Sequence, residues 1–188
     1  MTSGASSFGR RSLVFIGLMG AGKTAVGRRV AQALGMPFVD ADAEIEKAAG
    51  CSISDIFAVH GEAAFRDGER RVIARLLNDR VQVLSTGGGA FLDPDTRALI
   101  RERGISIWLR ADLEVLHKRT ARRNHRPLLQ TGNPRKILAD LIERRYPVYA
   151  EADLVVDTED QPVDQTVDKV LRELARYEER LEQAGSAT

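Results

Sequence analysis

The sequence predicts a three-layer α/β/α fold with a five-stranded parallel sheet. Short, almost continuously apolar runs alternate along the chain with segments of helical periodicity. This alternation is typical of parallel strands that helices cover on both faces. The length of 188 residues suits one compact domain, and no internal repeat or low-complexity linker divides it. We expect one domain over residues 12–182, with flexible tails at 1–11 and 183–188.

Five runs have the length and composition of strands that are buried on both faces. They are Leu13–Ile16, Phe38–Asp40, Val81–Ser85, Ile105–Leu109 and Leu154–Asp157.

The intervening helices carry their own start and stop signals. One apolar stripe, which Gly35 and Pro37 terminate, consists of Val26, Val30, Ala33 and Leu34. A second consists of Phe65, Val72, Ile73, Leu76 and Leu77. Asp93 and Pro94 predict the cap and first residue of a helix that ends near Gly104. The final helix is expected from Val163 to about Glu182.

The segment Thr120–Asn133 fits neither pattern. It lacks periodicity, is rich in Arg and Asn, and holds a proline close to two leucines. We interpret residues 120–133 as a mobile lid.

Composition limits where the protein works and what it binds. The formal net charge is +1, from 28 Lys and Arg against 27 Asp and Glu, so no global field favours nucleic acid or anionic lipid. Cys51 is the single cysteine, which suits a reducing cytoplasm. Arg10 and Arg11 loosely resemble a twin-arginine export signal, but the apolar run after them breaks at Gly17. We expect a cytoplasmic monomer that binds no membrane.

A phosphate-binding loop follows the first predicted strand. Residues 17–24 read Gly-Leu-Met-Gly-Ala-Gly-Lys-Thr, which is the P-loop pattern at the opening of a helix. Small residues let backbone N–H groups surround a phosphate, and the helix N-terminus adds partial positive charge. Lys23 supplies a full charge to the phosphate oxygens, and the Thr24 hydroxyl can bind Mg²⁺. A purely structural turn would need glycines but neither Lys nor Thr in register.

The remaining motifs favour a small-molecule kinase over a motor or a switch GTPase. Asn78-Asp79 lacks the spacing of a guanine-recognition turn, and the apolar run that ends at Asp157 comes late for a Mg²⁺-binding strand. A small-molecule kinase closes a lid over both of its substrates, and the segment 120–133 is the candidate.

Two carboxylates follow the second strand, at the edge where doubly wound sheets bind ligands. If both remain extended, Asp40 and Asp42 point the same way. One could then hold Mg²⁺ through water and the other could accept a hydroxyl proton. The alternative is that Asp42 only caps a helix that begins at Ala43 or Glu44.

Two further patterns have both a functional and a structural interpretation. Arg66 and Glu69 lie three apart on a helix and can pair, either within a site or as a surface salt bridge. Gly87, Gly88 and Gly89 follow the third strand, where they form either a flexible turn or a wall that a ligand approaches closely. We favour the ligand.

Together these motifs resemble the shikimate kinase family, whose fold is related to that of nucleoside monophosphate kinases. The resemblance runs from Gly17 to about Asp157. It includes the P-loop, the strand end that holds Asp40 and Asp42, Ala64-Phe65-Arg66 with Glu69, the glycine run, Arg126-Pro127-Leu128-Leu129, and Arg144-Arg145-Tyr146-Pro147-Val148-Tyr149. It implies a P-loop kinase fold with a mobile lid that transfers a phosphoryl group from ATP to the 3-hydroxyl of shikimate, in aromatic amino-acid synthesis.

The resemblance also implies a role for each matching residue. Catalytic roles fall on Lys23, Asp42 and Arg126. ATP contacts fall on Gly20, Ala21, Gly22, Lys23, Thr24, Ala25, Arg119 and Arg126. Shikimate contacts fall on Asp42, Arg66, Gly87, Gly88, Gly89 and Arg145, of which the two arginines form a carboxylate clamp. Thr24 would bind Mg²⁺ directly, and Asp40 would bind it through water.

The resemblance weakens after the last strand. The family usually has a basic residue and a proline near the adenine there, whereas this turn is acidic from Asp157 to Asp160. Pro162 would keep a packing role, and Gln161 would replace the basic contact. Two alternatives are a gluconate kinase, which would share the P-loop but not the clamp, and a non-enzymatic nucleotide-binding or nucleic-acid-binding module with the arginine-rich lid as its basic patch. The clamp argues against the first and the near-zero net charge against the second. We interpret Arg122 and Arg123 as solvated charge on the lid.

Overall fold

Five parallel strands form a single sheet in the order β2-β3-β1-β4-β5 in the computed structural model, which describes residues 11–122 and 132–185. The strands are β1 (Ser12–Ile16), β2 (Phe38–Asp40), β3 (Val83–Ser85), β4 (Gly104–Arg110) and β5 (Leu154–Asp157). The predicted five-stranded parallel sheet is therefore confirmed. Its centre is the core of the protein, because β1 is buried along its whole length and β4 along all but its last residue.

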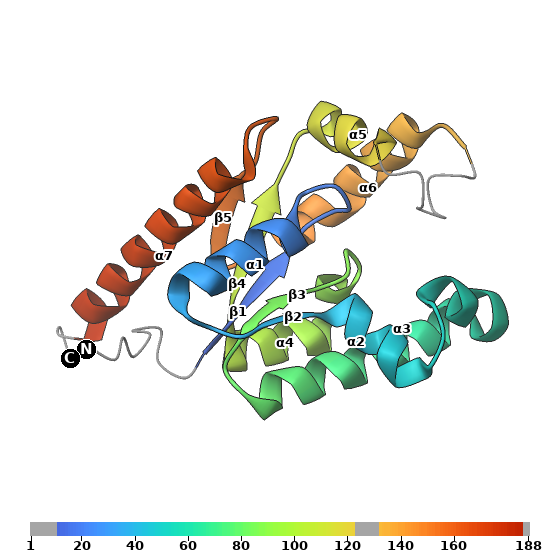
Figure 1. Ribbon diagram of the computed structural model, residues 1–188, viewed down its shortest axis with the longest axis horizontal. Coiled ribbons are helices and arrows are strands. Elements are labelled where there is room, and N and C mark those ends of the chain that lie inside the picture. The colour runs from blue at the N-terminus through green and yellow to red at the C-terminus, as the bar shows by residue number, and fades with distance from the viewer. Residues whose placement is uncertain (1–10, 123–131, 186–188) are drawn as a thin grey trace.

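Helices cover both faces of the sheet, as the alternating sequence pattern predicts. They are α1 (Lys23–Leu34), α2 (Ala41–Ala49), α3 (Ile53–Asp79), α4 (Pro94–Arg103), α5 (Leu113–Ala121), α6 (Pro134–Tyr149) and α7 (Val163–Gly185), with a short 3₁₀ helix η1 (Ala90–Leu92). Figure 1 shows α1 and α7 side by side on one face and α3 with α4 on the other. Helices α5 and α6 pack together beyond the carboxyl ends of the strands.

Strand order decides where the site forms. Strand β3 lies between β2 and β1, with Val83 opposite both Phe38 and Leu13. The loops that follow these three strands therefore leave the same edge of the sheet next to one another. The P-loop follows β1, the glycine run follows β3, and the two aspartates lie where β2 ends and α2 begins.

Two local expectations were wrong. Strand β3 begins at Val83 rather than Val81, because the backbone N–H of Gln82 donates to the Ser12 hydroxyl at 3.2 Å instead of joining the ladder. In α1 the buried alanine is Ala31, and Ala33 is exposed.

Helix α3 is bent within its length, a feature for which the sequence analysis made no prediction. Gly61 has φ 79° and ψ 174°, which no α-helical residue adopts, and so divides α3 into two segments. The apolar stripe predicted from Phe65 to Leu77 is buried and belongs wholly to the segment after Gly61. The segment before it carries Phe57 and the exposed Val59.

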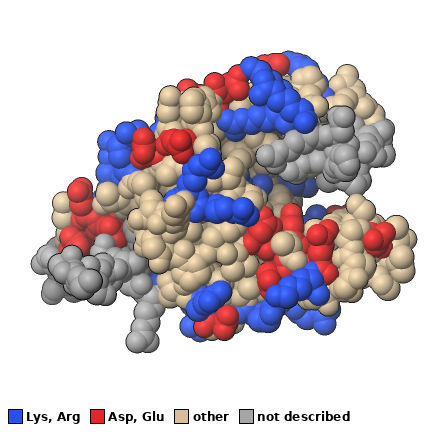
Figure 2. Space-filling view, viewed as in Figure 1, with Lys and Arg blue, Asp and Glu red and all other residues tan. Residues whose placement is uncertain are grey.

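Charges of both signs are interspersed over the surface drawn in Figure 2, so Lys and Arg form no single continuous patch on that face. Within the described residues, no helix combines the length and the apolar character needed to cross a membrane.

Candidate active site

The P-loop adopts the backbone that its glycines predict. Gly17, Gly20 and Gly22 have φ of 141°, 84° and 95°, in the region that favours glycine. Helix α1 starts at Lys23, and no side chain caps its first turn. By contrast, side chains cap α2, α3, α4 and α6. The first N–H groups of α1 therefore keep their capacity for an anion.

Lys23 lies over the loop that it is expected to serve. Its Nζ donates to the carbonyls of Gly17 at 2.9 Å and Leu18 at 3.1 Å. A lysine held against the loop carbonyls is positioned to meet a phosphate that the same loop binds.

Thr24 connects the P-loop to the two neighbouring strand ends. Its hydroxyl donates to Asp40 Oδ2 at 2.8 Å and lies 3.3 Å from Ser85 Oγ. Three oxygen-bearing side chains from α1, β2 and β3 thus meet within hydrogen-bonding distance. Ser85 is the member that the sequence analysis did not select.

The expected orientation of the two aspartates needs a correction. Asp40 itself caps α2, because its Oδ1 accepts from the N–H groups of Asp42 at 3.0 Å and Ala43 at 3.4 Å. The chain is therefore helical from Ala41, and Asp42 lies in the first turn rather than in an extended strand. The alternative in which Asp42 caps the helix is wrong for the same reason.

The glycine run lies against three charged side chains, those of Asp42, Arg145 and Arg66. A β-carbon on Gly87 would lie 2.8 Å from Asp42 Oδ1, and one on Gly88 would lie 3.1 Å from Arg145 Nη1. On Gly89 it would lie 2.3 Å from Arg66 Nη1. Real β-carbons almost never come as close to other atoms as those on Gly87 and Gly89 would, and the contact at Gly88 would be tight. A side chain at Gly87 or Gly89 would therefore displace the neighbouring charged group. The groups that approach the run are thus side chains of the protein itself, and the approach of a ligand to the same backbone stays a prediction.

Glu69 holds Arg66 in place through a hydrogen bond. Arg66 Nη1 donates to Glu69 Oε2 at 2.7 Å, as the three-residue spacing predicts. The Glu69 side chain is buried, and its Oε1 has no hydrogen-bond partner among residues 11–122 and 132–185. A β-carbon on Gly87 would lie 3.0 Å from this oxygen. Burial raises the pKa of Glu69, although the hydrogen bond and charge of Arg66 oppose the rise.

Tyr149 connects α6 to the glycine run. The ring is fully buried, and its hydroxyl donates to the Gly88 carbonyl. Burial raises the pKa of Tyr149 to about 12, although Arg145 opposes the rise, so the hydroxyl stays protonated and keeps donating at neutral pH. Trp108 and Tyr146 pack edge-on, with ring centroids 4.8 Å apart, and Trp108 also meets Tyr149. This aromatic contact positions the part of α6 that carries Arg145.

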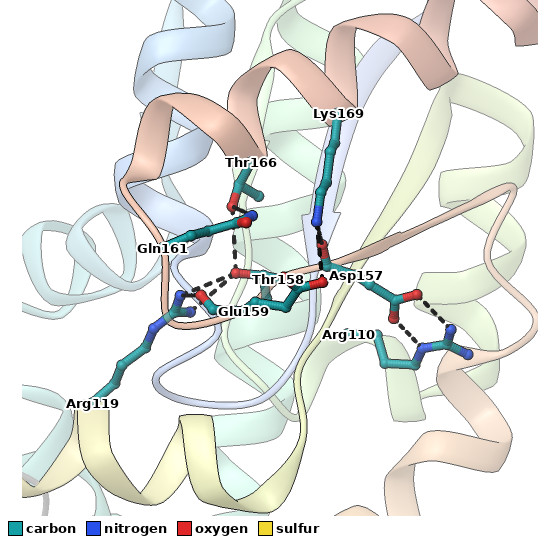
Figure 3. A network of polar contacts seen from close by, with 8 residues as sticks. All are labelled: Arg110, Arg119, Asp157, Thr158, Glu159, Gln161, Thr166 and Lys169. Carbon is teal, nitrogen blue, oxygen red and sulfur yellow. Dashed lines mark hydrogen bonds and ion pairs between the residues drawn. The ribbon is translucent and has the colours of Figure 1, made fainter.

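Arg119 extends from α5 and lies between the P-loop and the turn after β5 (Figure 3). Its Nη1 donates to the carbonyls of Gly20 at 3.3 Å and Ala21 at 3.4 Å. Thr158 Oγ1 and the Glu159 carbonyl accept from the same guanidinium. Burial lowers the pKa of Arg119, although the charge of Asp160 opposes this effect.

The acidic turn after β5 is neutralised by bases from three other elements. Arg110 pairs with Asp157, Lys118 with Asp160, and Lys169 with Glu159. The hydrogen bond from Arg110 is the main reason that the pKa of Asp157 is lowered.

Gln161 does not point toward Arg119. Its Nε2 donates to Thr166 Oγ1 at 3.3 Å (Figure 3). The amide is therefore directed at helix α7, whereas the expectation gave it the basic contact near the nucleotide.

The structure brings most of the expected residues to one edge of the sheet, in two groups. The donor group comprises Gly20, Ala21, Gly22, Lys23, Thr24, Ala25, Asp40 and Arg119. The acceptor group comprises Asp42, Arg66, Gly87, Gly88, Gly89 and Arg145. Arg126, Arg123 and the rest of residues 123–131, which make up most of the predicted lid, lie outside the described residues.

Sequence reasoning gave no role to Ser85, Tyr149 or Thr158. Tyr149 was quoted only as the end of a family motif, and Ser85 only as the residue before Thr86 and the glycines. In the described part of the chain, no three His, Cys, Asp or Glu side chains gather as metal ligands.

The fold and this arrangement define a P-loop kinase of small molecules: a glycine-rich loop joins the central strand to a helix, and acidic and basic side chains face it across the sheet edge. Comparison with known proteins identifies the acceptor. The shikimate kinase family model matches residues 19–175. The chain is 59% identical to the shikimate kinase of Paramagnetospirillum magneticum over 167 residues, and this alignment spans 89% of this chain and 86% of that protein. It is 50% identical to the enzyme of Rhizobium meliloti, over 92% and 90% of the two chains.

Solved structures agree with the sequence comparisons. Shikimate kinase from Acinetobacter baumannii, in complex with shikimate, superimposes with a TM-score of 0.85 at 38% identity, over 89% of this chain and 94% of that one. A gluconokinase from Sinorhizobium meliloti shares the fold, with a TM-score of 0.60 at 23% identity over 93% and 97% of the two chains. The chain belongs to the shikimate kinase family, and it is an ATP-dependent kinase that phosphorylates a hydroxyl of shikimate.

Replacing Gly87 by alanine tests whether close packing at the glycine run matters for catalysis. The added methyl group would push away the Asp42 carboxylate, which lies 2.8 Å from the β-carbon position. We expect kcat to fall by roughly 10- to 100-fold, since displacing a catalytic group by about 1 Å has that effect.

Gly68→Ala is the matched control, because nothing lies within 4 Å of a β-carbon there and Gly68 is inside α3. This control should leave kcat unchanged and raise the free energy of unfolding by about 0.5–1 kcal/mol. Normal turnover in Gly87→Ala would contradict the close packing.

Proposed function

We propose that the γ-phosphoryl group of ATP is transferred to the 3-hydroxyl of shikimate, giving shikimate 3-phosphate and ADP. One observation carries the proposal. The Gly87–Gly89 run touches Asp42, Arg145 and Arg66 in turn, and a β-carbon on Gly88 would also lie 3.4 Å from the carbonyl of Gly17 in the P-loop. The two arginines of the clamp, the carboxylate that would accept the hydroxyl proton and the phosphate loop therefore meet at one short backbone segment.

On the acceptor side, Arg66 and Arg145 bind the shikimate carboxylate. Planar guanidinium groups pair with carboxylate oxygens in two directed hydrogen bonds, which fixes the orientation of the ring. The Glu69 contact holds Arg66, and Tyr149 holds the backbone of Gly88. Gly87, Gly88 and Gly89 line the wall against which the substrate ring lies.

Asp42 orients the 3-hydroxyl. The hydroxyl oxygen attacks the γ-phosphorus, the bond from that phosphorus to the β-phosphate oxygen breaks, and the hydroxyl proton passes to Asp42. Positioning and charge neutralisation supply most of the rate enhancement in phosphoryl transfer, so a strong base is not required.

On the donor side, the N–H groups of Gly20, Gly22, Lys23 and Thr24 surround the phosphates, with Ala25 in the same first turn. Ala21 belongs to the same loop, and its N–H donates to the Leu18 carbonyl at 3.2 Å. Lys23 neutralises charge on the transferring group, and Arg126 of the lid approaches it from the opposite side. Arg119 lies against the adenine.

The residues around Thr24 fit a magnesium ion. The Thr24 hydroxyl lies 2.8 Å from Asp40 Oδ2 and 3.3 Å from Ser85 Oγ. Mg²⁺ prefers such oxygen ligands and keeps several of its waters. When bound, Mg²⁺ neutralises charge on the phosphate oxygens. Thr24 would bind it directly, and Asp40 would bind one of its waters.

We also propose that the protein works in the cytoplasm as a monomer, without a nucleic-acid or membrane partner. The formal net charge of +1 and the interspersed charges of Figure 2 disfavour binding to polyanions such as nucleic acid or anionic lipid. The single cysteine suits a reducing compartment.

Arg145→Ala tests the clamp. Loss of a charge-assisted pair to the shikimate carboxylate should raise the KM for shikimate by on the order of 100-fold and change the KM for ATP less than about twofold. Arg144→Ala is the control, because Arg144 is the exposed neighbour on the same helix, and it should match the wild type. Equal weakening of both substrates would remove Arg145 from the acceptor site. Phosphorus coupling to the proton on carbon 3 of the product verifies the position of transfer.

Asp40→Asn tests the metal contact separately from folding. Asparagine caps a helix as well as aspartate does, so α2 should persist, whereas the charge toward Mg²⁺ is lost. The Mg²⁺ concentration for half-maximal activity should rise about tenfold, as is common for groups that orient a metal's ligands. Asp93→Asn makes the same change at the cap of α4, where Thr96 and Arg70 are the partners, and should leave that concentration unchanged. An unchanged Mg²⁺ requirement in Asp40→Asn would contradict the assignment.

A further inference from the structure

Arg119 is held by protein groups on the edges of its guanidinium. Nη1 and Nη2 donate to Thr158 Oγ1 at 3.1 and 3.2 Å, and Nη2 also donates to the Glu159 carbonyl. Nη1 reaches the carbonyls of Gly20 and Ala21 on the opposite side. The terminal N–H groups are thus directed at protein oxygens, which leaves the flat faces of the guanidinium for a ligand.

Thr158 is the only side chain among these acceptors. It is 3% exposed, and its backbone N–H donates to the Arg110 carbonyl at 2.8 Å, which extends the contact between β4 and β5 by one residue. Its position is therefore set by the sheet rather than by the exposed part of the turn.

The hydroxyl of Thr158 is saturated by this arrangement. A hydroxyl oxygen has two lone pairs and one proton, and the two Arg119 nitrogens occupy the lone pairs. The proton is left for Thr166 Oγ1, which lies 3.5 Å away and also accepts from Gln161 Nε2 at 3.3 Å. As Figure 3 shows, Gln161, Thr166 and Thr158 lead from α7 to the guanidinium.

We propose that Thr158 is a positioning residue for nucleotide binding, which holds the guanidinium of Arg119 by both terminal nitrogens so that its flat face meets the adenine ring. The inference rests on the proposed contact between Arg119 and adenine. It assigns to the turn after β5 a function that Gln161 was expected to supply, and it gives this function to a buried hydroxyl instead.

Holding the guanidinium in place has a physical benefit. An arginine loses considerable side-chain entropy when a ligand immobilises it, and one that the protein already holds loses less. Burial lowers the pKa of Arg119, but guanidinium stays charged at neutral pH, so the face that it offers is cationic and favours an aromatic ring.

Thr158→Val removes the hydroxyl and conserves the shape of the side chain. We expect the Kd for ADP, measured by titration calorimetry, to rise about three- to tenfold, because one hydrogen-bonded contact of this kind has that effect. The KM for shikimate should stay within about twofold. Thr158→Ser retains the hydroxyl and should restore ADP binding to within about twofold of the wild type.

Thr166→Val is the matched control. Thr166 is equally buried and belongs to the same chain of hydroxyls, but it does not contact Arg119. A merely structural role for these threonines predicts similar loss of thermal stability in both variants and no selective change in ADP affinity. Positioning predicts weaker ADP binding in Thr158→Val alone.

Arg119→Ala separates failure of this inference from failure of the proposed function. If Arg119→Ala weakens ADP binding and Thr158→Val does not, the positioning role is wrong and the adenine contact stands. If Arg119→Ala leaves ADP binding unchanged, the adenine contact itself is wrong. Positioning also requires that Thr158→Val add nothing in the Arg119→Ala background, and an additive loss would overturn it.

Discussion

The close approach of the Gly87–Gly89 backbone to three charged side chains is the constraint on which the rest of the site depends. Each α-carbon of the run faces a different functional group: Asp42, Arg145 or Arg66. The approach exists because β3 lies between β2 and β1, so that the loop after β3 meets both the P-loop and the start of α2. The same strand order brings Ser85 to Thr24. A single topological feature thus joins the donor and acceptor halves of a kinase site.

Electrostatics and burial then determine how firmly these groups are held. Glu69 is a buried carboxylate whose pKa is raised by burial, and its hydrogen bond to Arg66 compensates part of that cost. Tyr149 stays protonated and donates to the Gly88 carbonyl from the other side. Neither side chain needs to touch a substrate to matter. Both hold groups that we propose to contact shikimate, the Gly88 backbone and Arg66, and such support gives a site assembled from loops the precision expected of packed elements.

Much of this architecture follows from local sequence signals. The strands Phe38–Asp40 and Leu154–Asp157 have the bounds that their apolar runs predict, and Gly17, Gly20 and Gly22 adopt the backbone that the P-loop requires. Local signals failed where a distant contact decided the outcome. The chain at Asp42 is helical because one carboxylate oxygen of Asp40 caps α2, and the other oxygen accepts from Thr24, which lies 16 residues earlier in the chain. Tyr149 and Gly88 are 61 residues apart, and periodicity contains no information about such a contact.

The central claim is that this site selects a carboxylated polyol as acceptor for the phosphoryl group of ATP. A coupled assay of ADP release over shikimate, gluconate and nucleoside monophosphates, with and without Mg²⁺, tests it most directly. We predict rapid turnover with shikimate and with none of the other acceptors, and loss of this turnover when Mg²⁺ is removed. Turnover that does not depend on shikimate, or that is equally fast with gluconate, would contradict it.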